Sequence, residues 1–403
     1  MQGEMQGKMQ GNDPEASVPD TVSSMDDDYM DIDVDPRTGH LTGTESQWQL
    51  IRRRFAKHRL AVISLWILSA FVLVAIFADF ISPVDPNDVN ARYTYAPPQG
   101  INFIDRTEDE GWRFRPYVYG YDVEIEPEAL RRVFVIDKTE KIYLEFFKRS
   151  WDYKLFGLFP TDIHLFGTEK ARKPLFILGA DRLGRDLFSR LAHGTRISLS
   201  VGLIGVILSL FLGVIVGGFA GYFGGVFDSA VQRVIEFLQS LPTIPLWMGL
   251  AAAMPSSWSP LQVYFAITLI LSLLGWTELA RVVRGRFLAL KTEDYVAAAR
   301  YDGCSHARVI LRHMVPSFTS HIITAASLAV PAMILAETAL SFLGLGLQAP
   351  VISWGVLLQE AQNIRTLATA PWLLLPGLAI VIAVLAMNFV GDGLRDAADP
   401  YSH

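Results

Sequence analysis

Residues 293–316 form the most patterned polar stretch of the chain. The alanines at positions 297–299 are strong helix formers, and Gly303 predicts the end of a short helix. A second short helix is expected over residues 305–314, until Pro316 blocks it. Small side chains on a short exposed helix allow the surface of another protein to approach closely. The pattern therefore predicts a protein contact, with an ordinary amphipathic loop as the alternative.

Glu337, within the motif AETALSFLGLG, is the best candidate for an ionisable residue at membrane depth. An ionisable side chain inside a membrane is a functional candidate by default. The alternative is that its carboxylate fixes one helix to a neighbour through hydrogen bonds.

Patterns for catalysis are missing from the sequence. No glycine-rich loop ends in Gly-Lys-Ser or Gly-Lys-Thr, so the usual phosphate cradle for ATP hydrolysis is absent. The eight histidines are scattered, and His313, beside Arg312, is interpreted as an interface residue. A formal net charge of −6 gives no sign of a nucleic-acid partner. We therefore predict that the chain is not an enzyme and has no catalytic residues, metal or cofactor of its own.

Long apolar runs separated by charged blocks must position Glu337 and the stretch 293–316. Of the 403 residues, 51% are hydrophobic, and a run of about 18 apolar residues crosses a bilayer as a helix. The runs predict an all-α polytopic membrane protein with about six transmembrane helices. They cover residues 60–81, 197–222, 237–254, 261–279, 322–342 and 373–390.

Glycines recur at every fourth position of the second run. Gly213, Gly217, Gly221 and Gly225 would form one smooth helix face, which permits close approach of another helix. The pattern indicates helix packing rather than a specific function. The polar residues between 228 and 236 are expected to form a short turn before the third helix.

Basic residues set the expected orientation. A basic cluster at 52–59 precedes the first run, and residues 281–316, which are expected to form a polar loop, are also rich in arginine. The positive-inside rule places both in the cytoplasm, so both chain termini are expected there. Residues 82–190 then form a mixed external region, with strands expected around 132–136 and 141–146.

Four parts of the chain follow from these patterns. Residues 1–50 are acidic and poor in apolar side chains, and are expected to be a disordered cytoplasmic tail. Residues 51–81 hold the basic anchor and first helix, residues 82–190 the external region, and residues 191–403 the transmembrane core.

The stretch 293–316 resembles the signature loop of the importer permeases of the ATP-binding-cassette (ABC) transporters. That signature reads Glu-Ala-Ala, three residues, Gly, and about nine residues to an Ile-x-Leu-Pro-like end. Ala297 stands where the signature often has Glu, which weakens the case for an ionic contact from this position. In the family this loop forms coupling helices that sit in a groove of the ATPase subunit. The resemblance thus implies ATPase contacts by Tyr295, Ala297, Ala298, Ala299, Gly303, His313 and Pro316.

Three further motifs extend the resemblance over residues 179–403. GADRLGRD at 179–186 is similar to the stretch that enters the core of the dipeptide/oligopeptide permease subfamily. SFLGLG at 341–346 resembles its last outer loop, and GDGLRD at 391–396 resembles its C-terminus. Together they resemble the C-type partner of the permease pair.

The resemblance implies a type I ABC importer permease fold in the bacterial inner membrane. The expected complex contains a homologous second permease, two ATPase subunits that bind ATP and Mg²⁺, and a periplasmic solute-binding protein, all embedded in or next to membrane lipid. The external residues 82–178, which have no match to the subfamily and are rich in aromatic side chains, are hypothesised to dock the binding protein, with independent folding at the surface as the alternative.

The substrate stays open at the level of sequence. Peptides are the commonest cargo of the subfamily, while nickel chelates, opines and oligosaccharides are the alternatives. An ion-gradient-driven transporter or channel is the alternative function. It would depend on Glu337, and the inverted repeat often found in such proteins is not visible.

Overall fold

The computed structural model describes residues 47–398 except 108–110, 127–130, 169–174 and 256. The chain divides into a unit at Met1–Leu50 and a unit at Ile51–His403, and the description below concerns the second. The disordered tail expected at residues 1–50 lies outside the described residues, apart from 47–50, which begin helix α1 (Gln47–Lys57).

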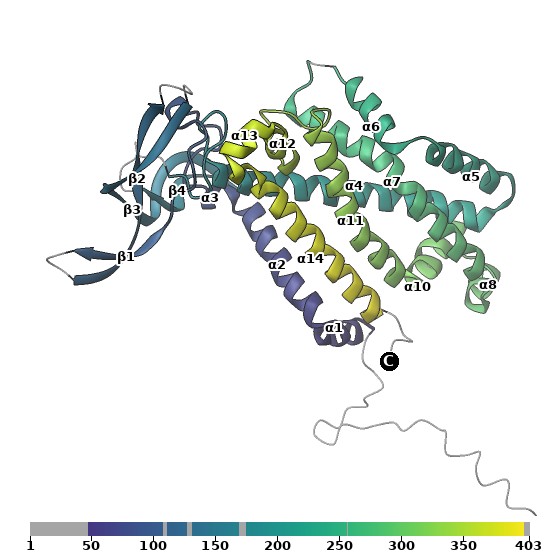
Figure 1. The fold of residues 1–403 in the computed structure, drawn as a ribbon. Coiled ribbons are helices and arrows are strands. Elements are labelled where there is room, and N and C mark those ends of the chain that lie inside the picture. The colour runs from purple at the N-terminus through teal and green to yellow at the C-terminus, as the bar shows by residue number, and fades with distance from the viewer. Residues whose placement is uncertain (1–46, 108–110, 127–130, 169–174, 256, 399–403) are drawn as a thin grey trace, which may run out of the picture. The chain divides into compact units, whose positions relative to one another are not determined.

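Five helices among the described residues are long and apolar enough to cross a membrane (Figure 1). Two shorter helices, α5 and α6, pass the same test as a bent pair, which matches the predicted number of about six. The long helices are α2 (Arg59–Ile76), α4 (Leu187–Phe223), α7 (Pro260–Leu290), α11 (Thr319–Phe342) and α14 (Leu375–Ala398).

The third predicted span, residues 237–254, is wrong as a straight helix. In its place α5 (Gly225–Ser240) and α6 (Thr243–Ala252) meet at an angle of 86°. The bend lies at Leu241 and Pro242, which both have extended backbone, because the residue before a proline is disfavoured in the helical region. Helix α5 also contains the polar residues expected in a turn, Asp228, Arg233 and Glu236.

The most extensive helix contact is between α4 and α7. Gly213, Gly217 and Gly221 of α4 lie in it, and a Cβ atom built on Gly217 would stand 2.3 Å from the carbonyl oxygen of Ala280. No larger side chain fits there without moving the backbone of α7. Gly225 does not share this face, because a Cβ atom there would meet nothing within 4 Å.

A four-stranded antiparallel sheet follows α3 (Ala78–Ile81) in the chain, with its strands in sequence order. The two strands expected around 132–136 and 141–146 are both parts of one long strand, β3. The pairing of β2 with β3 shifts its register between Tyr119 and Gly120. The strands are β1 (Asn102–Thr107), β2 (Gly111–Glu126), β3 (Arg131–Leu155) and β4 (Phe159–Thr168).

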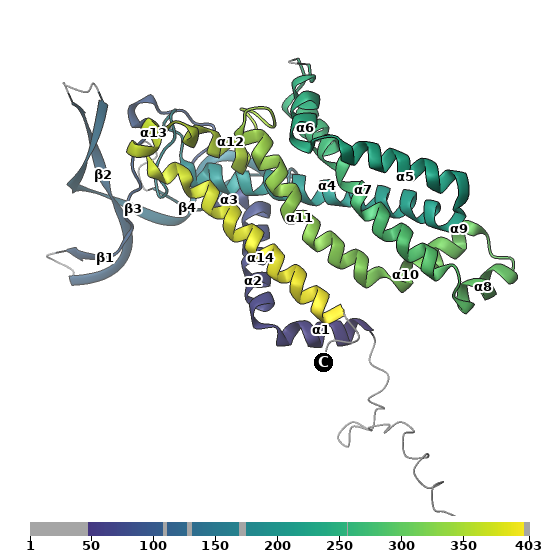
Figure 2. The ribbon, with the colours of Figure 1, turned by 45° about the vertical axis from the view of Figure 1, so that its right-hand side comes forward.

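The two ends of α4 have different surroundings (Figure 2). Its first turns lie beside α3 and the sheet, where the Arg190 guanidinium donates to the carbonyl of Pro86 at 3.0 Å. We call this the sheet end. At the opposite end of α4, called the α8 end, lies α8. The start of α2 and the end of α14 meet elsewhere, because a Cβ atom built on Gly393 of α14 would stand 2.4 Å from the Cβ atom of Ala61.

Candidate functional site

The arginine-rich stretch 281–316 begins as a continuation of α7 rather than as a loop. Val283 and Phe287, one turn apart, are fully buried in a cluster with residues of the following segment, so the helix continues to Leu290. The Arg284 guanidinium pairs with Asp228 of α5, with Nη2 and Oδ2 2.6 Å apart. The loop predicted at 281–316 is therefore wrong in its first ten residues, which include Arg281, Arg284 and Arg286.

Helix α8 (Asp294–Tyr301) ends next to Gly303, as predicted. Gly303 has a φ of +73°, and its N–H donates to the carbonyl of Arg300 at 3.1 Å. The N–H of Cys304 donates to the carbonyl of Ala299 at 3.1 Å. This pair of bonds is the Schellman arrangement, which favours glycine because the conformation is left-handed.

The second half of the stretch differs from the prediction at Pro316. The chain is helical through α9 (His306–Arg308), a π-helical turn η3 (Val309–Met314) and α10 (Val315–Ser317). Pro316 has no N–H to donate to the preceding turn, and the wide π turn precedes it. The helix breaks at Phe318, with φ −124°, before α11 begins.

The predicted contact residues fall on two faces of this stretch. Ala299 is 6% exposed and packs in the cluster with Phe287 and Met314, so it holds α8 to the chain's own core. Tyr301, which the sequence did not single out, is 92% exposed. Tyr295, Ala298, Gly303 and Pro316 are exposed, while Ala297 and His313 are half-buried.

Tyr295, Ala298 and Tyr301 are spaced by three residues and share one helix face. A small side chain thus lies between two tyrosines on an outward surface. The stretch is also tied to α4, because the Tyr222 hydroxyl and Nδ1 of His306 are 2.8 Å apart. The guanidinium of Arg300 lies 5.9 Å from the centre of the same tyrosine ring. These two contacts join α8 and α9 to the end of α4.

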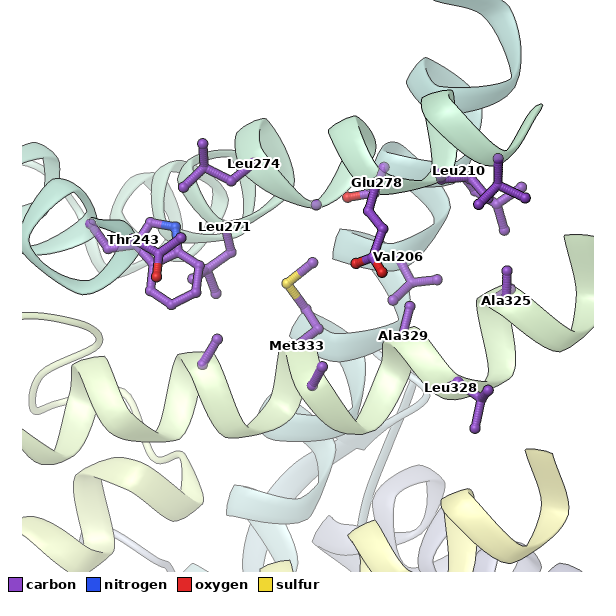
Figure 3. A pocket seen from close by; sticks show the side chains of 18 residues that line it. Val206, Leu210, Thr243, Leu271, Leu274, Glu278, Ala325, Leu328, Ala329 and Met333 are labelled. Atoms are coloured by element: carbon purple, nitrogen blue, oxygen red, sulfur yellow. The ribbon is translucent and has the colours of Figure 1, made fainter. Parts of the chain in front are cut away.

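A cavity of about 470 Å³ lies among α4, α6, α7 and α11. Alanine, leucine and valine side chains form most of its walls, and Glu278 is the one ionisable residue among those that line it. Figure 3 shows the Glu278 carboxylate extending from α7 toward Val206 and Ala329. Within the part of the chain that the structure describes, this exposed carboxylate forms no hydrogen bond or ion pair.

The sequence analysis did not single out Glu278. It stands at the edge of the predicted fourth span, residues 261–279, and arginines follow it. The sequence therefore places it at the boundary between membrane and water. The available signal was the apolar periodicity that continues through Val283 and Phe287. Because α7 continues to Leu290, Glu278 lies well inside the spanning helix.

Glu337 is fully buried and is not among the residues that line this cavity. Its carboxylate accepts hydrogen bonds from the hydroxyls of Ser341 and Ser353, each at 2.8 Å, and of Ser198 at 3.5 Å. The Ser198 hydroxyl in turn accepts from the N–H of Trp354 at 3.0 Å. These bonds join α4, α11 and α12 (Trp354–Gln359). A transport role for Glu337 stays a prediction.

The motif at 179–186 builds an ion-pair cluster at the sheet end. Asp181 Oδ2 lies 2.6 Å from Nε of Arg185 and 3.3 Å from Nε of Arg190. Arg185 also reaches Glu360, with Nη2 and Oε1 3.3 Å apart. Burial raises the pKa of Glu360, and the charge of Asp181 acts in the same direction. The cluster fastens the entry to α4 to the loop between α11 and α14.

Asp186 caps the first turn of α4. Its carboxylate accepts from the N–H and the hydroxyl of Ser189 at 2.8 and 2.6 Å. Burial raises the pKa of Asp186 to about 6, although these hydrogen bonds favour the charged form.

Two family models match the chain. Residues 213–401 match the family described as binding-protein-dependent transport system inner membrane component. Residues 46–98 match the N-terminal TM domain of oligopeptide transport permease C. The cavity residue Glu278 and all of α8 fall in the first match, whereas the sheet lies between the two matched ranges.

Named relatives share much of the chain. The oligopeptide transport system permease protein OppC of Salmonella typhimurium is 42% identical over 246 residues, which cover 61% of this chain and 79% of the relative. The protein of that name from Escherichia coli K12 is 43% identical over 223 residues, covering 55% and 71%. A putative peptide permease of Brucella ovis is 38% identical over 243 residues, covering 60% and 78%. This chain therefore belongs to the inner membrane components of binding-protein-dependent transport systems, the permease family of ABC importers.

Proposed function

We propose that this permease imports oligopeptides as one of two membrane-spanning subunits of an ABC importer. The observation that carries the proposal is the apolar cavity with the unpaired carboxylate of Glu278. Family membership favours this function over an ion-gradient-driven transporter or channel. Because the relatives are named as oligopeptide and peptide permeases, peptides are favoured over opines, oligosaccharides and nickel chelates.

The other subunits of the proposed importer are a homologous second permease, two ATPase subunits that bind ATP and Mg²⁺, and a periplasmic solute-binding protein. The complex lies in a bacterial inner membrane, with the α8 end in the cytoplasm and the sheet outside. This orientation is supported by charge, because the basic residues at 52–59, before α2, and Arg308 and Arg312, after α8, are expected in the cytoplasm by the positive-inside rule.

The exposed face of α8 is the proposed ATPase contact. Tyr295 and Tyr301 flank Ala298, and the small side chain leaves room for a partner surface between them. ATP binding closes the ATPase pair and displaces α8. The contact of Tyr222 with His306 then carries the displacement to α4. The mechanism is a two-state equilibrium that ATP shifts by binding one state better.

Glu278 is the proposed contact for the charged N-terminus of the peptide. The Glu278 carboxylate faces the cavity without a counter-ion among the described residues, so it is available to pair with an ammonium group. An oligopeptide carries such a group at its N-terminus, whereas an N-acetylated peptide does not. The carboxylate would thus hold the cargo briefly while it passes α7 and α11.

The test is uptake of trialanine and N-acetyl-trialanine by the complete importer in proteoliposomes. With Glu278→Gln, uptake of trialanine should fall by about tenfold, the effect of losing roughly 1.4 kcal/mol of charge attraction, while N-acetyl-trialanine uptake stays unchanged. Glu236→Gln, an exposed acidic residue of α5 outside the cavity, is the matched control.

The outcomes separate the two parts of the proposal. An equal loss for both peptides would contradict the ammonium contact but leave peptide import standing. An importer that takes up neither peptide with its binding protein present would contradict peptide import itself.

A further inference from the structure

The turn between β3 and β4 has an unusual composition for a hairpin. Such turns normally carry glycine, asparagine, aspartate or serine. Here Gly157 is surrounded by large apolar side chains, with Phe156, Leu158 and Phe159 exposed by 55%, 74% and 63%. Phe156 has a φ of +54°, a conformation that bulky residues rarely adopt. Exposed apolar side chains at such a tip suggest that something covers them.

The turn between β3 and β4, called the tip, lies at the end of a spanning helix. The ring of Phe156 packs edge-on against Phe77, the residue that follows α2, with centroids 5.7 Å apart. A groove of about 700 Å³ is formed there by α2, α4 and the tip. Val72 and Ile76 of α2 and Leu203 of α4, which line it, are roughly half exposed. The apolar wall of this groove thus belongs to two helices that are long and apolar enough to cross a membrane.

The polar end of the groove carries two cations and one carboxylate, those of Lys154, Arg196 and Asp79. Arg196 pairs with Asp79, with Nη2 and Oδ2 2.7 Å apart, and Asp79 also lies 2.9 Å from Nε2 of His193. Lys154 is exposed, and among the described residues its ammonium has no ion-pair partner. The groove therefore combines an apolar wall with one uncompensated positive charge among its lining residues.

We propose that this groove binds a phospholipid of the leaflet on the side of the sheet. One acyl chain lies along Val72, Ile76 and Leu203, and the phosphate pairs with Lys154. Phe156, Leu158 and Phe159 enter the interfacial layer, where aromatic side chains are favoured and lysine reaches the headgroups. A soluble partner is less favoured, because the groove is continuous with the spanning surfaces of α2 and α4. The lipid contact anchors the sheet beside the start of α4.

The location of the tip can be measured on the full chain in nanodiscs of phosphatidylglycerol and phosphatidylcholine. In a Cys304→Ser background, a nitroxide is attached at Phe159→Cys, or at Ile125→Cys near the other end of the sheet. These two side chains are equally exposed, at 63% and 65%. The label at 159 should collide more with oxygen and less with a water-soluble nickel chelate than the label at 125. Equal collision with the chelate at both sites would overturn the proposal.

The phosphate contact has its own test. Native mass spectrometry of the full chain should show that Lys154→Gln retains about fivefold less phosphatidylglycerol, the factor expected for one lysine at an anionic surface. Lys138→Gln, another exposed lysine of β3, should retain the wild-type amount. Equal retention by both variants would overturn the phosphate assignment. A label at 159 that is protected from the chelate only after the binding protein is added would overturn lipid binding and indicate a protein contact.

Discussion

Two carboxylates in the spanning helices have opposite surroundings. Glu337 of α11 is enclosed, and three serine hydroxyls from three elements donate to it. Glu278 of α7 faces a cavity lined by alanine, leucine and valine and has no partner among the described residues. An enclosed acidic group with satisfied hydrogen bonds contributes to holding helices together. An unpaired one beside a cavity is available to a passing ligand.

Residues 293–316 show the same contrast between an enclosed and an exposed side chain. Ala299 is buried among Phe287 and Met314 and belongs to the chain's own core. Its neighbour Ala298 is exposed between two tyrosines and has no role in that core. Adjacent alanines of one motif therefore serve different purposes, and only the exposed one is available to another subunit.

The largest expected effect is a loss of stability when Glu337, the enclosed carboxylate, is replaced. Glu337→Ala should lower the free energy of unfolding by about 4 kcal/mol, because serine hydroxyls lose their acceptor and a cavity forms. Glu337→Gln should cost clearly less, since the amide oxygen still accepts. Unfolding of the purified chain in detergent, followed by fluorescence, measures both. If Glu337→Ala is as stable as wild type, the hydrogen bonds at this site do not hold α4, α11 and α12 together.

A second enclosed carboxylate, Asp186, extends the comparison to the sheet end. Burial raises its pKa from 3.8 to about 6. The folded state then binds a proton more tightly than the unfolded state, so this contribution is present below pH 4 and is lost as the pH rises through 6. The free energy of unfolding should fall by about 3 kcal/mol over this range.

The measurement is the pH dependence of unfolding for wild type and Asp186→Asn between pH 4 and 7. The asparagine variant should lack most of this slope, because it cannot titrate. Identical slopes for the two proteins would show that Asp186 is charged in the folded state over the whole range.

Substitution of Ala298, the exposed alanine of α8, should affect transport rather than stability. Ala298→Arg is expected to reduce ATP-driven uptake by about tenfold, in the usual range for a lost coupling contact. A bulky charged side chain cannot enter a close-packed groove, whereas Ala298→Ser keeps the surface small and should transport normally. Ala299→Arg should instead reduce the amount of folded protein. Normal uptake by Ala298→Arg, measured in vesicles with the complete importer, would remove α8 from the ATPase contact.

The smallest effect on stability is expected at the open carboxylate. Glu278→Ala should change the free energy of unfolding by less than about 0.5 kcal/mol, as for other exposed side chains without partners. The same detergent assay used for Glu337→Ala provides the comparison. A loss similar to that of Glu337→Ala would mean that Glu278 is part of the fold and is not reserved for cargo.

The spanning helices and the short helix α8 could be predicted because both depend on local patterns. Apolar runs specify helices in lipid, and the alanines before Gly303 specify a helix and its end. The bend between α5 and α6 was missed because a hydropathy average does not register the backbone preference at Leu241. The single long strand β3 was missed because its pairing with β2 and β4 joins segments that read as separate strands.

The sequence by itself determined that this chain crosses the membrane several times, and its motifs indicated the permease family. These properties follow from composition and short-range spacing, since a helix satisfies its own backbone hydrogen bonds. The tertiary structure decided which acidic residue is enclosed and which faces the cavity. It also decided which alanine of α8 is exposed, because burial depends on the helices that pack against each face. Those contacts join residues more than one hundred positions apart, such as Ser198 and Glu337, and spacing along the chain does not specify them.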